Sequence, residues 1–175
     1  MQLVVPPTPQ AAQALADRRG VQARFIAGGT VIQQEWDEPR LAPDGVCLID
    51  VMSWPASRGI WLSEGHLHIG AAERLEHVRT DPLVRRHAPL LAEALGQLGA
   101  LGVRQLGTIG GNVGWGMGDS VPVLLALDAQ VELAEGRRIP VQDYLAMPAR
   151  PLMLSLQVPA VDAVSAVFEK VGYCG

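Results

Sequence analysis

The stretch "TIGGNVGWGMGDS", Thr108 to Ser120, has five glycines among its thirteen residues. Glycine loses more conformational entropy on folding than other residues, so a cluster this dense needs a compensating role. A positive φ angle, a close approach of two backbone segments, or a ligand lying on the main chain would each provide one. The apolar run "VPVLLALDAQVEL" follows directly. The stretch therefore predicts a glycine-rich loop before a helix over 120–128, with Asp119 or Ser120 as the N-cap.

A second glycine-rich segment, "RFIAGGTVIQQ", covers residues 24–34. It indicates a strand, then Gly28-Gly29 and Thr30, then the start of a helix. Backbone amides at such a helix start form a cradle for anions. Neither glycine segment matches the dinucleotide fingerprint or the phosphate-binding P-loop. Each segment leaves two interpretations open, a ligand cradle or a purely structural turn.

Composition excludes several functional classes. The chain has 175 residues, of which 49% are hydrophobic and 18% charged, as expected of a globular protein of one domain or two small lobes. The net charge of −4 and the lack of a Lys/Arg run argue against nucleic-acid binding. The apolar stretches are too short for a membrane span, and the first residues do not resemble a signal peptide. We therefore expect a cytoplasmic protein.

The cysteines and histidines predict no metal site. The two cysteines, Cys47 and Cys174, do not form a C-x-x-C motif and are too few for a four-cysteine cluster. His66 and His68 would share one face of a strand, but no third ligand lies nearby in the sequence. A G-x-S-x-G nucleophile motif is also missing, so we predict neither a catalytic side chain nor a bound metal.

The order of elements predicts an α+β fold with two lobes. Residues 1–55 would form a small β-α-β lobe, and residues 56–175 a larger lobe with an antiparallel sheet and flanking helices. The two glycine segments fall one in each lobe, and clefts between lobes are common binding positions. The predicted helices cover 9–19 (N-cap Thr8), 73–78, 81–100 with a break near Pro89, and 120–128. The predicted strands cover 23–27, 46–51, a hairpin over 59–71 with its turn at Glu64-Gly65, 129–135, 137–141, 152–158 and 166–171.

The order of the motifs resembles the FAD-binding domain of molybdopterin dehydrogenases. This is the medium flavoprotein subunit of the xanthine dehydrogenase, aldehyde oxidoreductase and carbon monoxide dehydrogenase group. The resemblance covers nearly the whole chain, and "GTIGGN" followed by "LLALDAQVEL" is its most specific part. The motifs that carry it are, in order, "RFIAGGT", "CLIDV", "LHIGAAERLEHV", "PLLAEALGQLGALGVRQLGTIGGNV", "DSVPVLLALDAQVEL", "RRIPVQDYLA", "LMLSLQVP" and "FEKVG".

The resemblance implies an FAD between the two lobes. The first glycine segment would wrap the pyrophosphate, and the second would approach the flavin and the diphosphate. Asp119 would hold the ribose or nearby polar groups, and Lys170 would reach the flavin ring, where a cation stabilises negative charge on reduction. The implied cofactor-binding residues are Ile26, Ala27, Gly28, Gly29, Thr30, Val31, Ile32, Gly107, Thr108, Gly110, Gly111, Asn112, Asp119, Leu152, Met153 and Lys170.

The resemblance also implies an electron relay. Electrons would pass from a large molybdenum-cofactor subunit through the clusters of an iron–sulfur subunit to the flavin, and then to an acceptor. The cysteine count agrees, because this chain cannot carry those clusters. No side chain of this chain needs to act as a general acid or base.

The chain departs from the family pattern at four places. Val31 and Pro151 stand where acidic residues are common, "VGWGMG" is shorter than the family's stretch, and the chain reads "YCG" where the family's C-terminal domain would follow. We expect that domain to be absent. Trp115 would either stack on the cofactor or pack locally. The alternative function is therefore an assembly or interaction module that keeps the fold without binding flavin.

Overall fold

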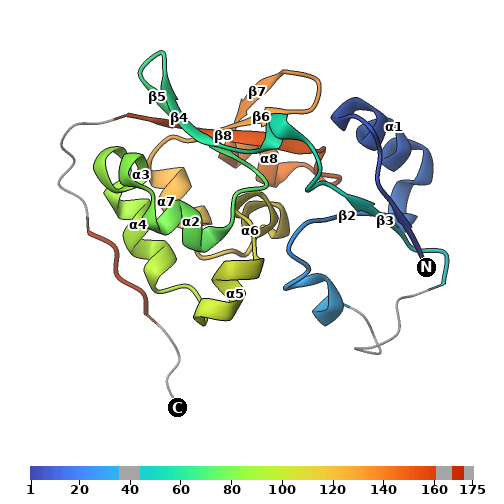
Figure 1. The fold of residues 1–175 in the computed structure, drawn as a ribbon, viewed down its shortest axis with the longest axis horizontal. Helices are drawn as coiled ribbons and strands as arrows, with labels where there is room; N and C mark the ends of the chain where they lie inside the picture. The colour runs from blue at the N-terminus through green and yellow to red at the C-terminus, as the bar shows by residue number, and fades with distance from the viewer. Residues whose placement is uncertain (36–43, 161–166, 172–175) are drawn as a thin grey trace.

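The computed structural model describes residues 1–35, 44–160 and 167–171 (Figure 1). It contains a three-stranded parallel sheet of order β1-β3-β2 and a five-stranded antiparallel sheet of order β4-β5-β8-β6-β7. Helices and strands occur both before and after residue 55. The predicted α+β class is confirmed.

The smaller sheet and one helix form the N-terminal part of the molecule. Its elements are β1 (Gln2–Val4), α1 (Pro9–Arg19), β2 (Ala23–Ile26) and β3 (Cys47–Asp50). As predicted, Thr8 is the N-cap of α1, and its side chain accepts a hydrogen bond from the Ala11 amide at 3.1 Å. The predicted helix start after Thr30 is a short 3₁₀ helix, η2 (Ile32–Glu35).

The larger sheet consists of β4 (Ile60–Ser63), β5 (His66–Gly70), β8 (Met153–Pro159), β6 (Gln130–Leu133) and β7 (Arg138–Pro140). β4 and β5 form the predicted hairpin. Glu64 and Gly65 both have positive φ angles, +51° and +74°, which suit a two-residue turn between antiparallel strands. Two further short 3₁₀ helices, η1 (Gly20–Gln22) and η3 (Pro55–Ser57), lie in connections.

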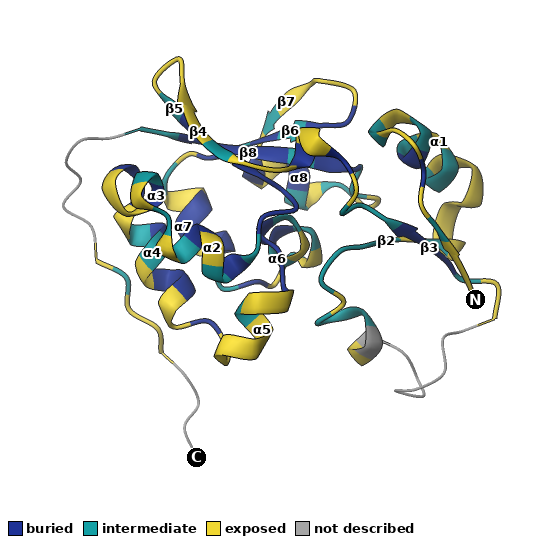
Figure 2. Ribbon diagram, in the orientation of Figure 1, coloured by how far each residue is buried: buried dark blue, intermediate teal, exposed yellow. Residues whose placement is uncertain are grey.

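Helices α2 to α7 lie on one side of the larger sheet (Figure 1). Buried residues of these helices and of the sheet are dark blue in Figure 2. They belong to one core, which includes Leu67, Leu156, Leu95 and Leu124. The helix predicted over 81–100 breaks before Pro89, as expected. The helices are α2 (Leu75–Thr80), α3 (Pro82–His87), α4 (Pro89–Gly96), α5 (Leu101–Leu106), α6 (Ile109–Trp115), α7 (Val121–Ala126) and α8 (Val141–Ala146).

Two predictions of secondary structure are wrong. The glycine-rich stretch is not a continuous loop, because residues 109–115 form helix α6, which Thr108 caps and which ends at Gly116 with φ +85°. The strand predicted over 166–171 is also absent from the described residues, since 167–171 adopt no regular structure and 166 lies outside the described residues. β1, α5 and α8 were not predicted.

Polar contacts from α1 join the two parts. The Gln10 side-chain amide donates to the Ala134 carbonyl at 2.8 Å, and the Leu152 amide donates to the Gln13 side chain at 2.6 Å. Ala134 and Leu152 also pack in the same small core as Cys47. The start of β8 therefore lies at the seam between the N-terminal sheet and the larger sheet.

Candidate functional site

The two glycine-rich segments meet in the structure. A Cβ atom added at Gly28 would lie 2.0 Å from the carbonyl oxygen of Leu106 and 2.8 Å from the Cα atom of Gly107. The Thr30 hydroxyl lies 3.5 Å from the position of a Cβ atom on Gly107. We call residues 28–30 and 106–108 the glycine junction. Only glycine at position 28 permits this approach of two main chains.

The first segment of the junction has free donors. Within the part of the chain that the structure describes, the amides of Gly28, Gly29 and Thr30 have no hydrogen-bond partner. Gly29 is exposed, its φ angle is +67°, and the space where its Cβ atom would stand is empty to 4 Å. Consecutive free amides around a left-handed residue form a concave nest that suits an anion.

The second segment, Gly107 to Asn112, differs because nearly all of its backbone amides donate hydrogen bonds within the protein. From Gly107 to Asn112, only the Thr108 amide lacks a partner among the described residues. Gly110 is also occupied sterically, since its Cβ atom would lie 2.7 Å from both the Cβ atom and the carbonyl oxygen of Ala71. The amides donate from Gly107 to Val103 (2.7 Å), Ile109 to Glu73 (2.9 Å), Gly110 to Ala71 (2.9 Å), Gly111 to the Thr108 hydroxyl (3.0 Å) and Asn112 to the Thr108 carbonyl (2.9 Å).

Asn112, a predicted cofactor-binding residue, joins helices α6 and α7. Its side-chain oxygen accepts hydrogen bonds from the Ser120 amide at 3.2 Å and the Ser120 hydroxyl at 2.5 Å. Ser120 is the N-cap residue of α7. Its hydroxyl donates to Asn112 and makes no capping hydrogen bond to the helix. A Cβ atom on Gly118 would lie 2.2 Å from the same Asn112 oxygen. This asparagine therefore fixes the turn that leads to Asp119.

Asp119 and Lys170 pair with each other. The Lys170 Nζ atom lies 2.7 Å from the Asp119 carboxylate and donates to the Gln97 carbonyl at 3.3 Å. Figure 1 shows the described C-terminal segment beside the helices and at the opposite end of the molecule from β2. The structure therefore brings these two predicted residues together, beside the end of α4.

The other predicted residues take several positions. Leu152 and Met153 are buried, the first in the small N-terminal core and the second in the large core. Trp115 is 36% exposed at the end of α6 and belongs to neither hydrophobic core. Ile26, Ala27, Val31 and Ile32 flank the free amides and are half-buried.

Arginines that the sequence reasoning missed support the second segment. The Arg74 guanidinium donates to the Leu106 carbonyl, which faces Gly28. Arg150 donates to the carbonyls of Gly114 and Leu145, and so ties the end of α6 to α8. Arg104 of α5 donates to the Glu76 carboxylate of α2. The contacts to Leu106, Gly114 and Glu76 join positions distant in sequence, so local patterns carry little signal for them.

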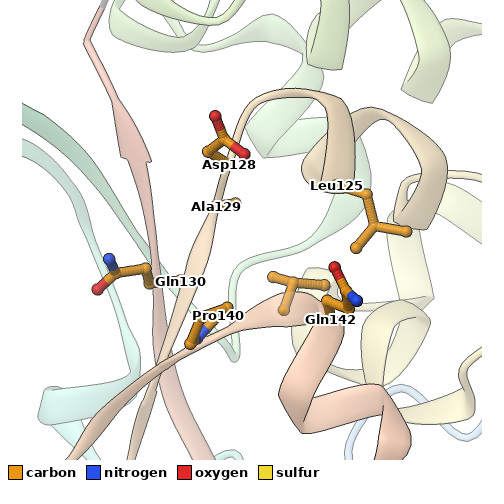
Figure 3. Close-up of a pocket in the computed structure, with 7 residues that line it drawn as sticks. Leu125, Asp128, Ala129, Gln130, Pro140 and Gln142 are labelled. Carbon is orange, nitrogen blue, oxygen red and sulfur yellow. The ribbon is translucent and has the colours of Figure 1, made fainter.

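A hollow of about 340 Å³ lies between α7, α8 and β6 (Figure 3). The residues that line it are Leu125, Asp128, Ala129, Gln130, Pro140, Val141 and Gln142. None of its lining residues belongs to the glycine junction or to the predicted site.

His68, a candidate metal ligand in the sequence, stacks on Trp61 with ring centroids 5.0 Å apart. Among the described residues, no group of three His, Cys, Asp or Glu side chains could hold a metal.

Comparison with known proteins decides the family. Residues 1–161 match the family described as "FAD binding domain in molybdopterin dehydrogenase". The chain belongs to this family. FAD, the cofactor expected from the sequence, is thereby confirmed as the cofactor of the domain.

Named relatives of this FAD-binding domain are subunits of dehydrogenases. The nicotinate dehydrogenase FAD-subunit of Eubacterium barkeri is 35% identical over 121 residues, which cover 68% of this chain and 40% of the relative. The carbon monoxide dehydrogenase medium chain of Hydrogenophaga pseudoflava is 31% identical over 160 residues, covering 85% of this chain and 55% of the relative. This chain therefore spans about half the length of these relatives.

A solved structure agrees with the fold of the FAD-binding domain. Carbon monoxide dehydrogenase from Hydrogenophaga pseudoflava, lacking the Mo-pyranopterin moiety of its cofactor, superposes with a TM-score of 0.80 at 27% identity. The match covers 93% of this chain and 60% of that one. The lengths again show that the solved chain extends well beyond the matched region.

The glycine junction fits the group that the family binds. FAD carries a diphosphate, and the free amides of Gly28, Gly29 and Thr30 surround an open position at Gly29. A side chain at position 29 would occupy that open space. The fit is strongest at the first segment, because the amides at the start of α6 already have protein acceptors.

Proposed function

We propose that this domain works as the electron-transfer part of a molybdopterin-dependent dehydrogenase. In this proposal the chain receives electrons from the iron–sulfur clusters of a partner subunit and passes them to an acceptor. The observation that carries it is the nest of amides at Gly28, Gly29 and Thr30, which have no partner among the described residues, in a chain of this family. FAD, when bound, supplies the one- and two-electron chemistry.

The chain's own residues bind and orient. The amides of the first segment would hold the diphosphate, and Gly107 leaves room for main-chain approach on the other side of the junction. We include Ile26 to Ile32, and Gly107 to Asn112, in the proposed site. Asp119, Leu152, Met153 and Lys170 remain predictions from the resemblance, since the structure gives each of them other contacts.

Partner subunits follow from the cysteines and the relatives. The chain has two cysteines, and Cys47 is buried in the N-terminal core, so an iron–sulfur cluster with four cysteine ligands lies outside these 175 residues. Relatives are named as an FAD-subunit and as a medium chain. We infer an iron–sulfur subunit and a large molybdenum-cofactor subunit as partners, and the cytoplasm as the location. No helix in the described part is long and apolar enough to cross a membrane.

The alternative, an assembly module without flavin, is favoured by one observation. Val31, next to these amides, offers no polar group to the cofactor at a position where the family resemblance implies an acidic residue. The two functions differ in flavin binding. Purified chain, titrated with FAD and followed by visible absorption and flavin fluorescence, should take up FAD. A folded chain that takes up none in excess FAD would support the assembly module.

A matched pair of variants tests where FAD binds. Gly29→Ala adds a methyl group among the free amides, at φ +67°, and we expect FAD affinity to fall about tenfold or more. Gly65→Ala is the control, because Gly65 has φ +74° and equally open surroundings but lies in the β4–β5 turn. Both variants should lose similar stability. Equal loss of FAD affinity in both would contradict the proposed site.

A further inference from the structure

Helix α5, which leads into the glycine junction, is held by a polar side chain instead of an apolar face. None of its residues is buried, and Leu101, Val103 and Leu106 are 50%, 41% and 57% exposed. Figure 2 shows the helix exposed along nearly its whole length. The Arg104 side chain, in contrast, is only 13% exposed. Apolar burial therefore contributes little to the position of α5, and Arg104 contributes much.

Arg104 makes three hydrogen bonds away from its own helix. Its Nε atom donates to the Glu76 carboxylate of α2 at 2.7 Å, and its terminal nitrogen donates to the carbonyls of Leu98 and Gly99 at 3.0 and 2.8 Å. Glu76 is also held by Arg79, at 2.5 Å. Arg79 and, to a lesser degree, Arg104 lower the pKa of Glu76 from 4.5 to about 2, so the carboxylate stays charged well into acid solution.

The end of α5 forms one wall of the junction. The Gly107 amide donates to the Val103 carbonyl at 2.7 Å, and the Gly107 carbonyl accepts from the Leu75 amide at 3.0 Å. The Leu106 carbonyl faces Gly28 so closely that a Cβ atom there would stand 2.0 Å away. A small displacement of α5 would therefore change the distance between the two glycine segments.

We propose that Arg104 is a positioning residue for the glycine junction. By holding α5 against α2 and the 98–99 turn, it fixes the Leu106–Gly107 peptide opposite Gly28 and sets the shape of the FAD site. The proposal rests on the proposed function for the identity of the ligand, whereas the position of the peptide can be measured without any ligand.

The test compares two arginines that share one carboxylate. Arg104→Gln removes the bonds from α5, and we expect FAD affinity to fall about tenfold and the Gly107 amide to exchange its hydrogen faster in the flavin-free chain. Arg79→Gln removes the other guanidinium from Glu76 but leaves α5 tethered. It should change neither quantity more than about twofold. Thermal unfolding of both variants measures any general loss of stability.

Three outcomes would overturn the proposal. They are unchanged Gly107 exchange in folded Arg104→Gln, equal effects in both variants, or FAD affinity that is unchanged when exchange is faster. Arg104→Lys keeps the charge but cannot make all three bonds, so it should lower FAD affinity and speed Gly107 exchange less than Arg104→Gln does. It decides the question if Arg104→Gln does not fold. If the parent chain binds no FAD, the proposed function fails, and the exchange rates still decide whether Arg104 positions the peptide.

Discussion

The two glycine-rich segments use glycine in different ways. At Gly28, Gly29 and Thr30 the amides are without partners in the described chain, and the space beside Gly29 is open. Around Gly110 the amides are used by the protein, and Ala71 fills the space where a side chain would stand. The first segment leaves its backbone available to a ligand, while the second uses it mainly to pack a short helix against neighbouring chain.

Glycine therefore has two roles here, contact with a ligand and close packing of the backbone, and the family resemblance does not distinguish them. Family membership assigns FAD to the domain, but it does not say which glycines touch FAD and which permit packing. Gly28 belongs to both groups, because it lies in the segment with free amides and also receives the Leu106 carbonyl. Substitutions that are small in volume can therefore distinguish backbone contact from ligand contact.

The largest effect is expected for Gly28→Ala. The added Cβ atom would stand 2.0 Å from the Leu106 oxygen, which is backbone and cannot rotate away. Such overpacking should lower the free energy of unfolding by about 3 kcal/mol and abolish FAD uptake by the fraction that folds. Urea unfolding and FAD titration would measure the two effects.

The control for Gly28 is Gly102→Ala. Gly102 lies in α5 with no atom near its Cβ position, so alanine there should leave stability unchanged or raise it by about 0.5–1 kcal/mol. If Gly28→Ala proves as stable as the parent, the two segments do not approach as closely as the structure shows.

A smaller effect should separate the neighbours Gly110 and Gly111. A Cβ atom on Gly110 would meet rigid parts of Ala71 at 2.7 Å, and we expect Gly110→Ala to lose about 2 kcal/mol. On Gly111 it would meet only the Thr108 hydroxyl, at 3.0 Å, so Gly111→Ala should change stability by less than about 1 kcal/mol. Thermal or urea unfolding measures the difference.

FAD titration of the same two variants then sharpens the comparison. If the second segment also lies against the cofactor, Gly111→Ala should weaken FAD binding even though its fold is intact. Unchanged affinity would restrict the cofactor contacts to the first segment and the Thr108 amide. Equal stability losses at Gly110 and Gly111 would contradict the packing of α6 against Ala71.

The parts of the fold that were predicted correctly have local causes. Thr8-Pro9 begins a helix, Pro89 breaks one, and Glu64-Gly65 turns a hairpin, because each depends on the conformation of a few adjacent residues. Helix α6 was missed because glycine is a poor helix former. The helix is stabilised instead by tertiary bonds from its first amides to carbonyls of Glu73 and Ala71.

The candidate site was predictable only in part. The two glycine segments could be identified as candidates from the sequence, and the family resemblance connected them with FAD. Their contact through Gly28 and Leu106, and the arginine that holds α5, depend on residues distant in sequence. The exposed Leu101, Val103 and Leu106 give no helical periodicity toward a core, so no local pattern indicated that Arg104 faces inward.

The smallest effect is expected for the acid stability that depends on Glu76, the carboxylate that Arg104 of α5 contacts. The folded-state pKa of Glu76 is about 2, below its ordinary value of 4.5, because Arg79 and Arg104 stabilise the carboxylate. Its contribution is therefore fully present above pH 4.5 and is lost as the pH falls toward 2. Urea unfolding between pH 5 and pH 2 should show a shallower pH dependence for Glu76→Gln than for the parent. Glu93→Gln, at an exposed position on α4, is the control, and an identical slope in Glu76→Gln and the parent would show that this carboxylate does not support α5.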